Sequence, residues 1–490
     1  MRVSRVVLLI LLVATVACVI PYGSVRSSRA TLRFAVWGMP FEDRLFEDIY
    51  ARGFERRYPA VTVDYQRYQD LTDKYFAWHL LGRGADVMRV RITDYHAFVA
   101  RGMLEPLNRF INDPSIGLTD EEQADYMPAI WNLLEVQGNQ YALPSDNAQY
   151  GLYYNKASFD QYNLAHPDDP LEYPSADWTW DDLRETARKL TVRDADDNLI
   201  GYGIDFDLWA WPFMAFLAQA GGELWDAPQT TTLINSPQGL EALQLIIDLL
   251  PHSASMRAVG GVGSAVGPDK LFAAGQTAML LDGSWRAPDL ERVQPDLDFA
   301  IAPLPRHRRS AVVSGSVLWA ISIHSNQKES AWRMIRWMTN REESLRYWDT
   351  LRVAPPARLS VMRSKAFRQT AGLVDDDGAV LVHSMPAERF DDRAAWLLYA
   401  VTVDPDTGST PGFVPVAPYQ KDLEDSIEAM LKRAVSPTRA EPLKHLLDNA
   451  AEALHRIIDR DRNARGLPRV ERNRRSARAD QPLPHKPPGH

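Results

Sequence analysis

Tryptophans that stand beside polar residues are the side chains best suited to chemistry in this chain. A sugar ring offers hydroxyls to planar hydrogen-bonding groups and a C–H face to aromatic rings. A sugar site therefore combines Trp or Tyr with Asp, Asn, Arg or Glu. The chain has 14 tryptophans, and the candidates are Trp37, Trp209, Trp211 and Trp285. These residue types could bind a carbohydrate.

Polar residues near these tryptophans supply the hydrogen-bonding groups. Asp146 could accept two sugar hydroxyls, and the guanidinium of Arg286 could donate through its fork of N–H groups. Arg91 directly follows a predicted strand, and ligands commonly bind at such strand ends in α/β folds. The predicted binding set joins the tryptophans to these polar positions: Glu42, Arg91, Ser145, Asp146, Asn147, Gln149, Ser284, Arg286, Gly315 and Ser316.

Composition and missing motifs exclude several other classes of function. The net charge of −9 gives the protein no basic field for a nucleic-acid backbone, so we expect no nucleic-acid partner. Cys18 is the only cysteine, which rules out an intramolecular disulfide and a CxxC site. No GxSxG or HExxH motif is present, and the histidines lack ligand spacing, so we predict neither a metal nor a cofactor.

The two ends of the sequence differ from its body. Arg2 and Arg5 precede an apolar run over residues 6–20, which predicts an export signal within residues 1–30. The tripeptide before Cys18 resembles a bacterial lipoprotein box, which implies lipidation of Cys18; cleavage near Ala17 or Ala30 and an uncleaved anchor remain alternatives. Each alternative places the body outside the cytoplasm. Residues 460–490 are basic and rich in proline, which predicts a disordered tail that could also meet anionic lipid.

From residue 31 the pattern alternates between short β-branched runs and amphipathic helical stretches. Residues 32–37, 61–65 and 85–90 are predicted strands, and residues 41–57 have helical spacing. This alternation predicts an α/β fold whose sheet has a large parallel component. We find no internal repeat.

Several motifs then follow in a fixed order along the chain. Residues 142–144 read ALP and residues 153–156 read YYNK; a TWDD helix start, an F-x-x-G-x-x-A-M…G-x-W segment and a G-S-V-L-W-A-I-S segment come after them at residues 179–182, 272–285 and 315–322. In this order they resemble the bacterial extracellular solute-binding proteins of family 1, the maltose-binding-protein-like receptors of ABC importers. The resemblance spans about residues 32–458.

The resemblance implies two α/β lobes joined by crossing strands, with a ligand cleft between them. By that pattern the N-terminal lobe holds residues 31–147 and 303–342, and the C-terminal lobe holds residues 150–298 and 346–458. The crossings are expected near Asn147, Ala300 and Ser344. The implied function is a non-enzymatic, monomeric, extracytoplasmic receptor, anchored at its N-terminus, that delivers a sugar or oligosaccharide to the permease subunits of an ABC transporter.

Two kinds of alternative stay open. A secreted carbohydrate-active enzyme needs only two carboxylates, which the many acidic residues could supply. The same receptor could instead carry a polyamine, a peptide or a sugar phosphate. The segment from Arg89 to Asp94 departs from the maltose-receptor pattern, which has an aromatic there, and its two arginines could suit an acidic sugar.

Overall fold

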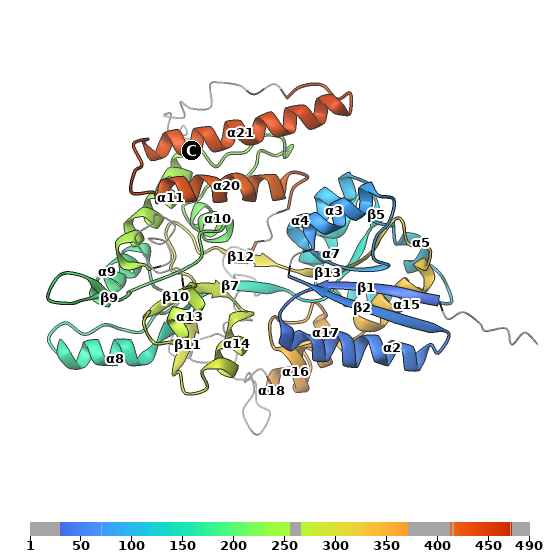
Figure 1. The fold of residues 1–490 in the computed structure, drawn as a ribbon, viewed down its shortest axis with the longest axis horizontal. Coiled ribbons are helices and arrows are strands. Elements are labelled where there is room, and N and C mark those ends of the chain that lie inside the picture. Colours follow the sequence, from blue (N-terminus) through green and yellow to red (C-terminus); the bar gives the residue numbers. More distant parts are fainter. Residues whose placement is uncertain are drawn as a thin grey trace, which may run out of the picture.

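Two α/β lobes, each built on its own sheet, lie side by side in the computed structural model (Figure 1). The structure describes residues 30–69, 71–254, 266–370, 412–413, 416–470 and 472. Cys18 and the predicted export signal therefore lie outside the described residues. Within the described residues, no helix is long and apolar enough to cross a membrane.

The first lobe is built on a five-stranded sheet in the order β2-β1-β3-β13-β6. The strands are β1 (Ala30–Trp37), β2 (Val61–Tyr68), β3 (Val87–Arg91), β6 (Ala142–Pro144) and β13 (Val317–Ile321). β1 pairs in parallel with β2 and β3, whereas β13 is antiparallel to β3 and β6. The buried aromatic rings of Phe34 on β1 and Trp319 on β13 pack against each other in the core of this lobe.

Short helices cover both faces of this sheet. The region predicted as one helix over residues 41–57 is split into three helical elements that follow one another directly. The Thr119 and Glu122 side chains form a capping box at the start of α6, which satisfies backbone N–H groups that the helix leaves free. The elements of this lobe outside the sheet are η1 (Pro40–Glu42), η2 (Arg44–Ala51), α2 (Arg52–Arg57), α3 (Thr72–Leu80), α4 (Ile92–Ala100), α5 (Asn108–Ile111), α6 (Asp120–Ala124), α7 (Pro128–Trp131), η3 (Asn132–Leu134), β4 (Glu135–Val136), β5 (Asn139–Gln140), α15 (Lys328–Met338) and α16 (Arg341–Leu351).

The second lobe is organised around one long strand, β7 (Ala148–Asn155). β10 (Met279–Gly283) pairs along one edge of β7, and β11 (Phe299–Ala302) and β12 (Val312–Gly315) pair along the other, all antiparallel to it. β14 (Gly412–Phe413) extends the sheet beside β12. The helix α10 (Ala210–Gln219) is buried along its whole length, so it forms the centre of this lobe's core.

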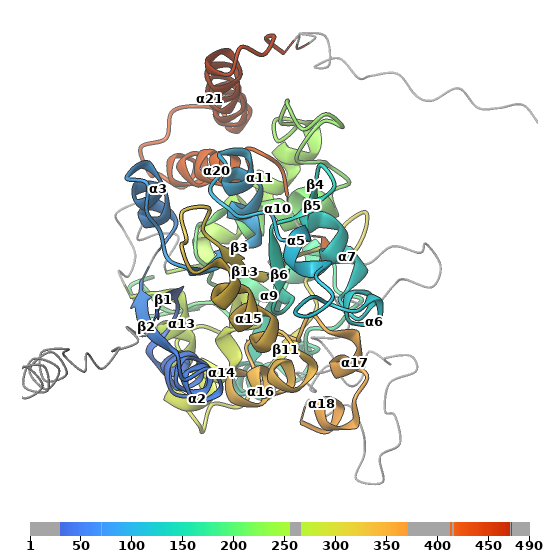
Figure 2. The same cartoon turned by 90° about the vertical axis from the view of Figure 1, so that its right-hand side faces the viewer.

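The remaining elements surround this core. They are α8 (Lys156–Ala165), α9 (Trp180–Lys189), β8 (Val192–Arg193), β9 (Leu199–Gly201), α11 (Pro237–Leu249), η4 (Leu250–His252), α13 (Pro268–Ala273), α14 (Arg286–Val293), α20 (Gln420–Ala434) and α21 (Leu443–Ala464). In both views α21 lies outermost, with α20 between it and the rest of the molecule (Figure 1, Figure 2).

The chain crosses between the lobes at places that differ in part from the sequence-based boundaries. The first crossing lies between β6 and β7, at residues 145–147. The second lies at Ser316, between β12 and β13, and not near Ala300, because β11 and β12 both pair with β7 in the second sheet. Residues 303–315 therefore belong to the second lobe.

The third connection also differs from the boundary predicted near Ser344. α16 and the residues after it still pack in the first lobe, where Tyr347 and Ala357 belong to the core. Trp348, on another face of α16, packs instead with Tyr153 and Phe272 of the second lobe. α17 (Leu359–Met362) and α18 (Lys365–Thr370) follow directly. Residues 346–358 therefore lie at the junction and are not simply part of the second lobe.

The predicted tail begins later than residue 460. α21 continues to Ala464 because its apolar positions, including Leu454 and Ile458, stay buried against the second lobe. After the helix the chain remains in contact with the lobe, since Val470 packs on its core and Arg472 pairs with Asp459. Residues 473–490 lie outside the described part of the chain.

Candidate functional site

Three predicted tryptophans meet in the second lobe at its junction with the first. The rings of Trp209 and Trp211 are stacked, with centroids 5.0 Å apart and planes at 11°. Trp285 stands nearly perpendicular to both, with its centroid 6.0 Å from Trp209 and 5.7 Å from Trp211. Trp211 is buried, whereas Trp209 and Trp285 are half-buried and keep ring surface that a ligand can contact.

Trp285 touches both lobes. It packs against the core of the second lobe and also against the core of the first. Its ring covers Gly283 so closely that a Cβ at that residue would lie 2.1 Å from the indole. The position just before α14 therefore projects a large aromatic ring across the junction.

Gly315 serves the tryptophan cluster by its lack of a side chain. A Cβ at this residue would lie 2.6 Å from the six-membered ring of Trp211, which is too close for a real contact. Gly315 ends β12 directly before the crossing at Ser316. The predicted site residue therefore provides space for Trp211.

The first lobe contributes Trp37 together with two arginines. The guanidinium of Arg89 lies 4.3 Å from the ring centroid of Trp37, and that of Arg91 lies 4.9 Å from it. Arg89 is buried, and it donates to the backbone oxygen of Trp37 at 2.5 Å. Arg91 is only partly buried, and it lies 3.9 Å from the carboxylate of Asp94. Cation–π contacts of this kind fix the ring of Trp37 at the end of β1.

Glu42 is predicted from sequence to contact ligand, but the structure buries it. Its carboxylate lies 2.9 Å from Nη1 of Arg89 and accepts from the backbone N–H of Met39 at 2.6 Å. Since both carboxylate oxygens have protein partners, Glu42 positions Arg89 and the turn after β1. Its partner Arg89 lies 47 positions away in the sequence, which local pattern does not reveal.

Asp146 is also predicted to bind ligand and instead joins the crossing segments. One carboxylate oxygen accepts from the backbone N–H of Val317 at 2.9 Å, and the other accepts from the phenol of Tyr347 at 2.6 Å. Its backbone oxygen accepts from the hydroxyl of Ser316 at 2.6 Å. Burial raises the pKa of Asp146 to about 6. Asp146 and Ser316 therefore hold together the segments that cross between the lobes.

Two neighbours of Asp146 belong to the same crossing. The backbone N–H of Ser145 donates to Val317, and that of Asn147 donates to Pro355, each at 2.8 Å. Both side chains are buried. These two hydrogen bonds attach the first crossing segment to the second crossing, at Val317, and to the third connection, at Pro355.

A group of buried side-chain atoms near this crossing lacks a hydrogen-bond partner among the described residues. It comprises Oδ1 of Asn147, both amide atoms of Gln149 and the hydroxyl of Ser314. Gln149 and Ser314 face each other across β7 and β12. Strand alternation places them on the face opposite Tyr150, whose ring meets the tryptophan cluster. Gln149 is thus buried in the second lobe away from the exposed surfaces of Trp209 and Trp285.

Ser284 and Arg286 are occupied by protein contacts. The hydroxyl of Ser284 donates to the backbone oxygen of Val353 at 2.6 Å, which joins the second lobe to the third crossing segment. Arg286 lies 2.6 Å from Asp282, 3.2 Å from Asp269 and 3.2 Å from Asp289. Burial alone would lower the pKa of the guanidinium, but Asp282 and Asp269 raise it. The three ion pairs leave Arg286 little capacity for a ligand.

Asp207 is a candidate that the sequence reasoning missed. It stands two residues before Trp209 and is exposed. Although its side chain keeps exposed surface, desolvation by the surrounding protein raises its pKa to about 6, together with the neighbouring carboxylates of Asp282 and Asp269. The sequence signal that could have identified Asp207 is its position directly before the tryptophan-containing segment Leu208–Pro212. Among the described residues, no cluster of three or more His, Cys, Asp or Glu could hold a metal ion.

The fold and the aromatic junction define a two-lobed binding protein. The family model for bacterial extracellular solute-binding proteins matches residues 40–344, which is more than half of the sequence. The chain therefore belongs to that family, whose members are binding proteins and act outside the cytoplasm.

One relative in sequence and two solved structures agree with this family assignment. A maltotriose-binding protein of Pyrococcus abyssi is 23% identical over 323 residues, which are 63% of this chain and 62% of that protein. The chain thus spans about three-fifths of the length of this relative. An ABC substrate-binding protein of Listeria monocytogenes in complex with cycloalternan superposes with a TM-score of 0.70 at 19% identity, covering 90% of this chain and 100% of that one. The GacH receptor of Streptomyces glaucescens, solved unliganded and with acarbose, gives a TM-score of 0.68 at 18% identity, with 88% and 98% covered.

Proposed function

We propose that this protein is the substrate-binding component of an ABC importer and that it captures a sugar or oligosaccharide between its lobes. The observation that carries the proposal is the cluster of Trp209, Trp211 and Trp285, which presents half-buried indole rings where the lobes meet. Aromatic faces suit the C–H faces of sugars. Trp37 with Arg91 on the first lobe supplies a second aromatic surface and hydrogen-bond donors.

Capture requires only that the ligand bind the closed state better than the open one. A ligand held by both lobes when they close, and by one when they open, shifts the hinge equilibrium toward closure. A shift from 1:99 to 99:1 needs about 5.5 kcal/mol of differential affinity. Trp285 already packs against both cores, so its ring is placed to make contacts that depend on closure.

The related solute-binding proteins support a saccharide as the cargo. The relatives named above bind maltotriose, cycloalternan or acarbose by their own descriptions. We extend that chemistry to this chain, together with delivery to ABC permease subunits, action as a monomer and attachment to the membrane through the N-terminal segment at Cys18. No catalytic step is required by this function.

A thermal-shift screen tests the proposal. The full chain is heated with neutral mono- and oligosaccharides, acidic sugars, sugar phosphates, polyamines and peptides. A ligand at 100 times its dissociation constant adds about 2.7 kcal/mol of stability, which raises the melting temperature. A rise with saccharides alone supports the proposal. A rise only with polyamines or peptides contradicts the sugar assignment, and release of a hydrolysed product from a glycan would favour the secreted enzyme instead.

A further inference from the structure

Helix α20 of the second lobe packs directly against α4 of the first lobe (Figure 1). The residue Val416, just before α20, also bridges the lobes. Its backbone oxygen accepts from Gln229 of the second lobe at 3.0 Å, while its side chain packs on a core cluster of the first lobe. α20 itself is anchored to the second lobe, where Gln420 accepts from the indole of Trp225 at 3.1 Å. The lobes therefore touch here outside the three segments that connect them.

Asp94, in the first turn of α4, links this contact to the proposed ligand surface of the first lobe. Its carboxylate lies 3.9 Å from Arg91 at the end of β3. The guanidinium of Arg91 lies 4.9 Å from the ring centroid of Trp37. Ligands of α/β folds bind beside the carboxyl ends of the strands, so α4 begins on the ligand side of its sheet. Opening the lobes on this side requires α20 to leave α4.

Opposite charges face each other across the contact. Burial raises the pKa of Asp422 on α20, and the guanidinium of Arg101 on the first lobe opposes that shift. Burial alone would lower the pKa of Lys421, but Asp425 and then Asp94 raise it. Arg101 with Asp422, and Asp94 with Lys421, are thus attractive pairs between the lobes.

Glu424 is the exception, because it brings a second carboxyl group toward Asp94. It is partly buried, and one of its oxygens accepts from the side chain of Gln420 at 3.2 Å. The pKa of Glu424 is raised to about 8, first by burial and then by Asp94. Gln420 and Lys421 oppose this rise, and Glu428 adds to it. Near neutral pH the carboxyl group is therefore protonated while the lobes are together.

Two further helices pack on α20. α10 carries no charged side chain. α21 presents Asp461, which accepts from the phenol of Tyr419 at 2.7 Å and lies 3.1 Å from Arg465. Asp94 is therefore a charged neighbour that Glu424 loses when the lobes separate.

We propose that the contact between α4 and α20 is a clasp that holds the lobes closed beside the cleft while Glu424 is protonated, and that capture of the ligand near neutral pH takes up a proton from the solvent. For its ligand the inference rests on the proposed function, whereas the clasp itself does not. Separation of the lobes returns Glu424 to water, where a glutamate is ionised at pH 7. This contribution to closure is complete below the open-state pKa and is lost as pH rises through about 8.

The first test needs no ligand. Nitroxide labels at Leu80→Cys on α3 and Ile457→Cys on α21, both exposed positions, report the distance between the lobes by pulsed electron resonance in a chain with Cys18→Ser. A group with a closed-state pKa of about 8 should lower the closed-to-open ratio about tenfold between pH 7 and pH 9. Glu424→Gln should keep one distance distribution over this range, because glutamine has no proton to lose.

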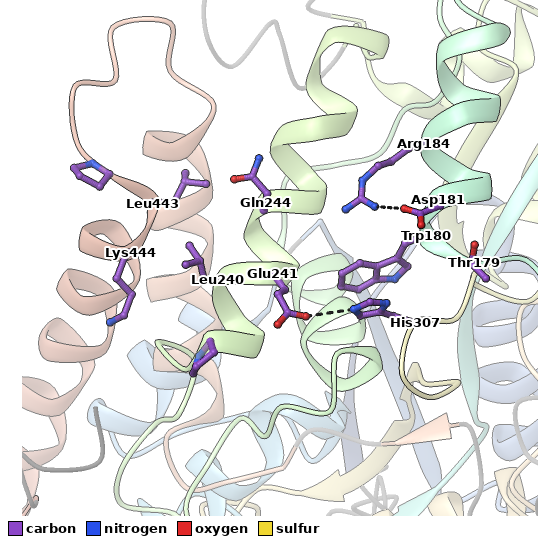
Figure 3. A pocket seen from close by; sticks show the side chains of 12 residues that line it. Thr179, Trp180, Asp181, Arg184, Leu240, Glu241, Gln244, His307, Leu443 and Lys444 are labelled. Atoms are coloured by element: carbon purple, nitrogen blue, oxygen red, sulfur yellow. Dashed lines mark hydrogen bonds and ion pairs between the residues drawn. The ribbon is translucent and has the colours of Figure 1, made fainter. Parts of the chain in front are cut away.

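Glu241→Gln is the matched control, since it makes the same change in the same lobe. Glu241 lies 3.3 Å from His307 in a groove between α9, α11 and α21 that second-lobe residues line (Figure 3). This variant should keep the pH response of the unaltered protein. An unaltered protein with the same distance distribution at pH 7 and pH 9, or an equal response in Glu424→Gln, overturns the clasp.

Calorimetry with the best ligand of the thermal-shift screen tests the proton uptake. Titrations at pH 7 in buffers that differ in ionisation enthalpy should show uptake of about one proton per ligand, and Glu424→Gln should abolish it. Binding without uptake, or with the same uptake in Glu424→Gln, contradicts the proposal. If no ligand of the screen binds, the proposed function fails, while the labelled protein still decides whether the clasp exists.

Discussion

The phenol of Tyr347 donates a 2.6 Å hydrogen bond to the carboxylate of Asp146, although 201 residues separate them in the sequence. Asp146 lies in the first crossing between the lobes, and Tyr347 lies on α16, which leads into the third. Because Asp146 also accepts from Val317 and Ser316 of the second crossing, one buried aspartate links the three segments. The hinge of the proposed receptor is therefore a defined hydrogen-bonded unit.

Removing the Tyr347 hydroxyl should weaken this unit. Tyr347→Phe leaves one buried carboxylate oxygen of Asp146 without a donor, and hydrogen bonds to charged groups contribute roughly 1.5–3 kcal/mol. We expect a loss of that size in the free energy of unfolding, measured by urea titration at pH 7. Tyr173→Phe, which removes an exposed bond to Asp160, is the control and should change stability far less. Equal losses for both variants would contradict the hinge role of Tyr347.

Gly315→Ala should disturb the tryptophan cluster. The added methyl group would lie 2.6 Å from Trp211, so either the ring or β12 must move. We expect a loss of about 1–3 kcal/mol in stability from overpacking, together with a change in near-ultraviolet circular dichroism from the tryptophans. Gly102→Ala has open space around its Cβ, so it should leave the tryptophan signal unchanged, although its positive φ costs stability of its own. An unchanged tryptophan signal in Gly315→Ala would show that the close approach is not tight.

Glu424, on α20 where it packs against α4, should make the stability of the protein depend on pH. The pKa of Glu424 is raised to about 8, first by burial and then by the nearby carboxylate of Asp94 on α4. Gln420 and Lys421 oppose this shift, and Glu428 supports it. The folded state thus holds the Glu424 proton more tightly than the unfolded state, so this contribution is complete below the unfolded pKa and is lost as pH rises through about 8.

The corresponding measurement is the melting temperature between pH 5 and pH 9. The decrease over that interval should be smaller in Glu424→Gln, because glutamine stays neutral at every pH. Glu329→Gln changes an exposed residue of α15 that pairs with Arg333, and it should keep the pH profile of the unaltered protein. Superimposable profiles for Glu424→Gln and the unaltered protein would show that Glu424 does not titrate in this range.

Short-range pattern predicted the class of fold correctly, and three of the tryptophans that it singled out lie together in the structure. The ordered motifs from ALP to G-S-V-L-W-A-I-S lie on β6, β7, α9, β10 and β13, and the family match confirms the recognition. The crossing at Ser316 was placed wrongly near Ala300, because β11 and β12 are short buried strands whose sequences do not show which sheet they join. Pairing with β7 decides that question.

The polar members of the site were harder to predict, because a polar residue in a turn can bind either a ligand or the protein itself. The partners of Asp146, Glu42 and Arg286 decide which, and the partners of the first two are distant in sequence. Trp209 and Trp285 keep exposed surface even after packing, so both stay predicted ligand contacts. Asp207 was missed because an exposed acid before an apolar segment is common in proteins.

The measurement that tests the central claim most directly is a calorimetric titration of the best saccharide from the thermal-shift screen against three proteins. These are the unaltered chain, Trp285→Ala, and Trp78→Ala as a control on α3, away from the tryptophan cluster. The account predicts that Trp285→Ala weakens binding at least tenfold, about 1.4 kcal/mol, while Trp78→Ala binds normally. Unchanged affinity in a folded Trp285→Ala protein would contradict capture of the sugar at this junction.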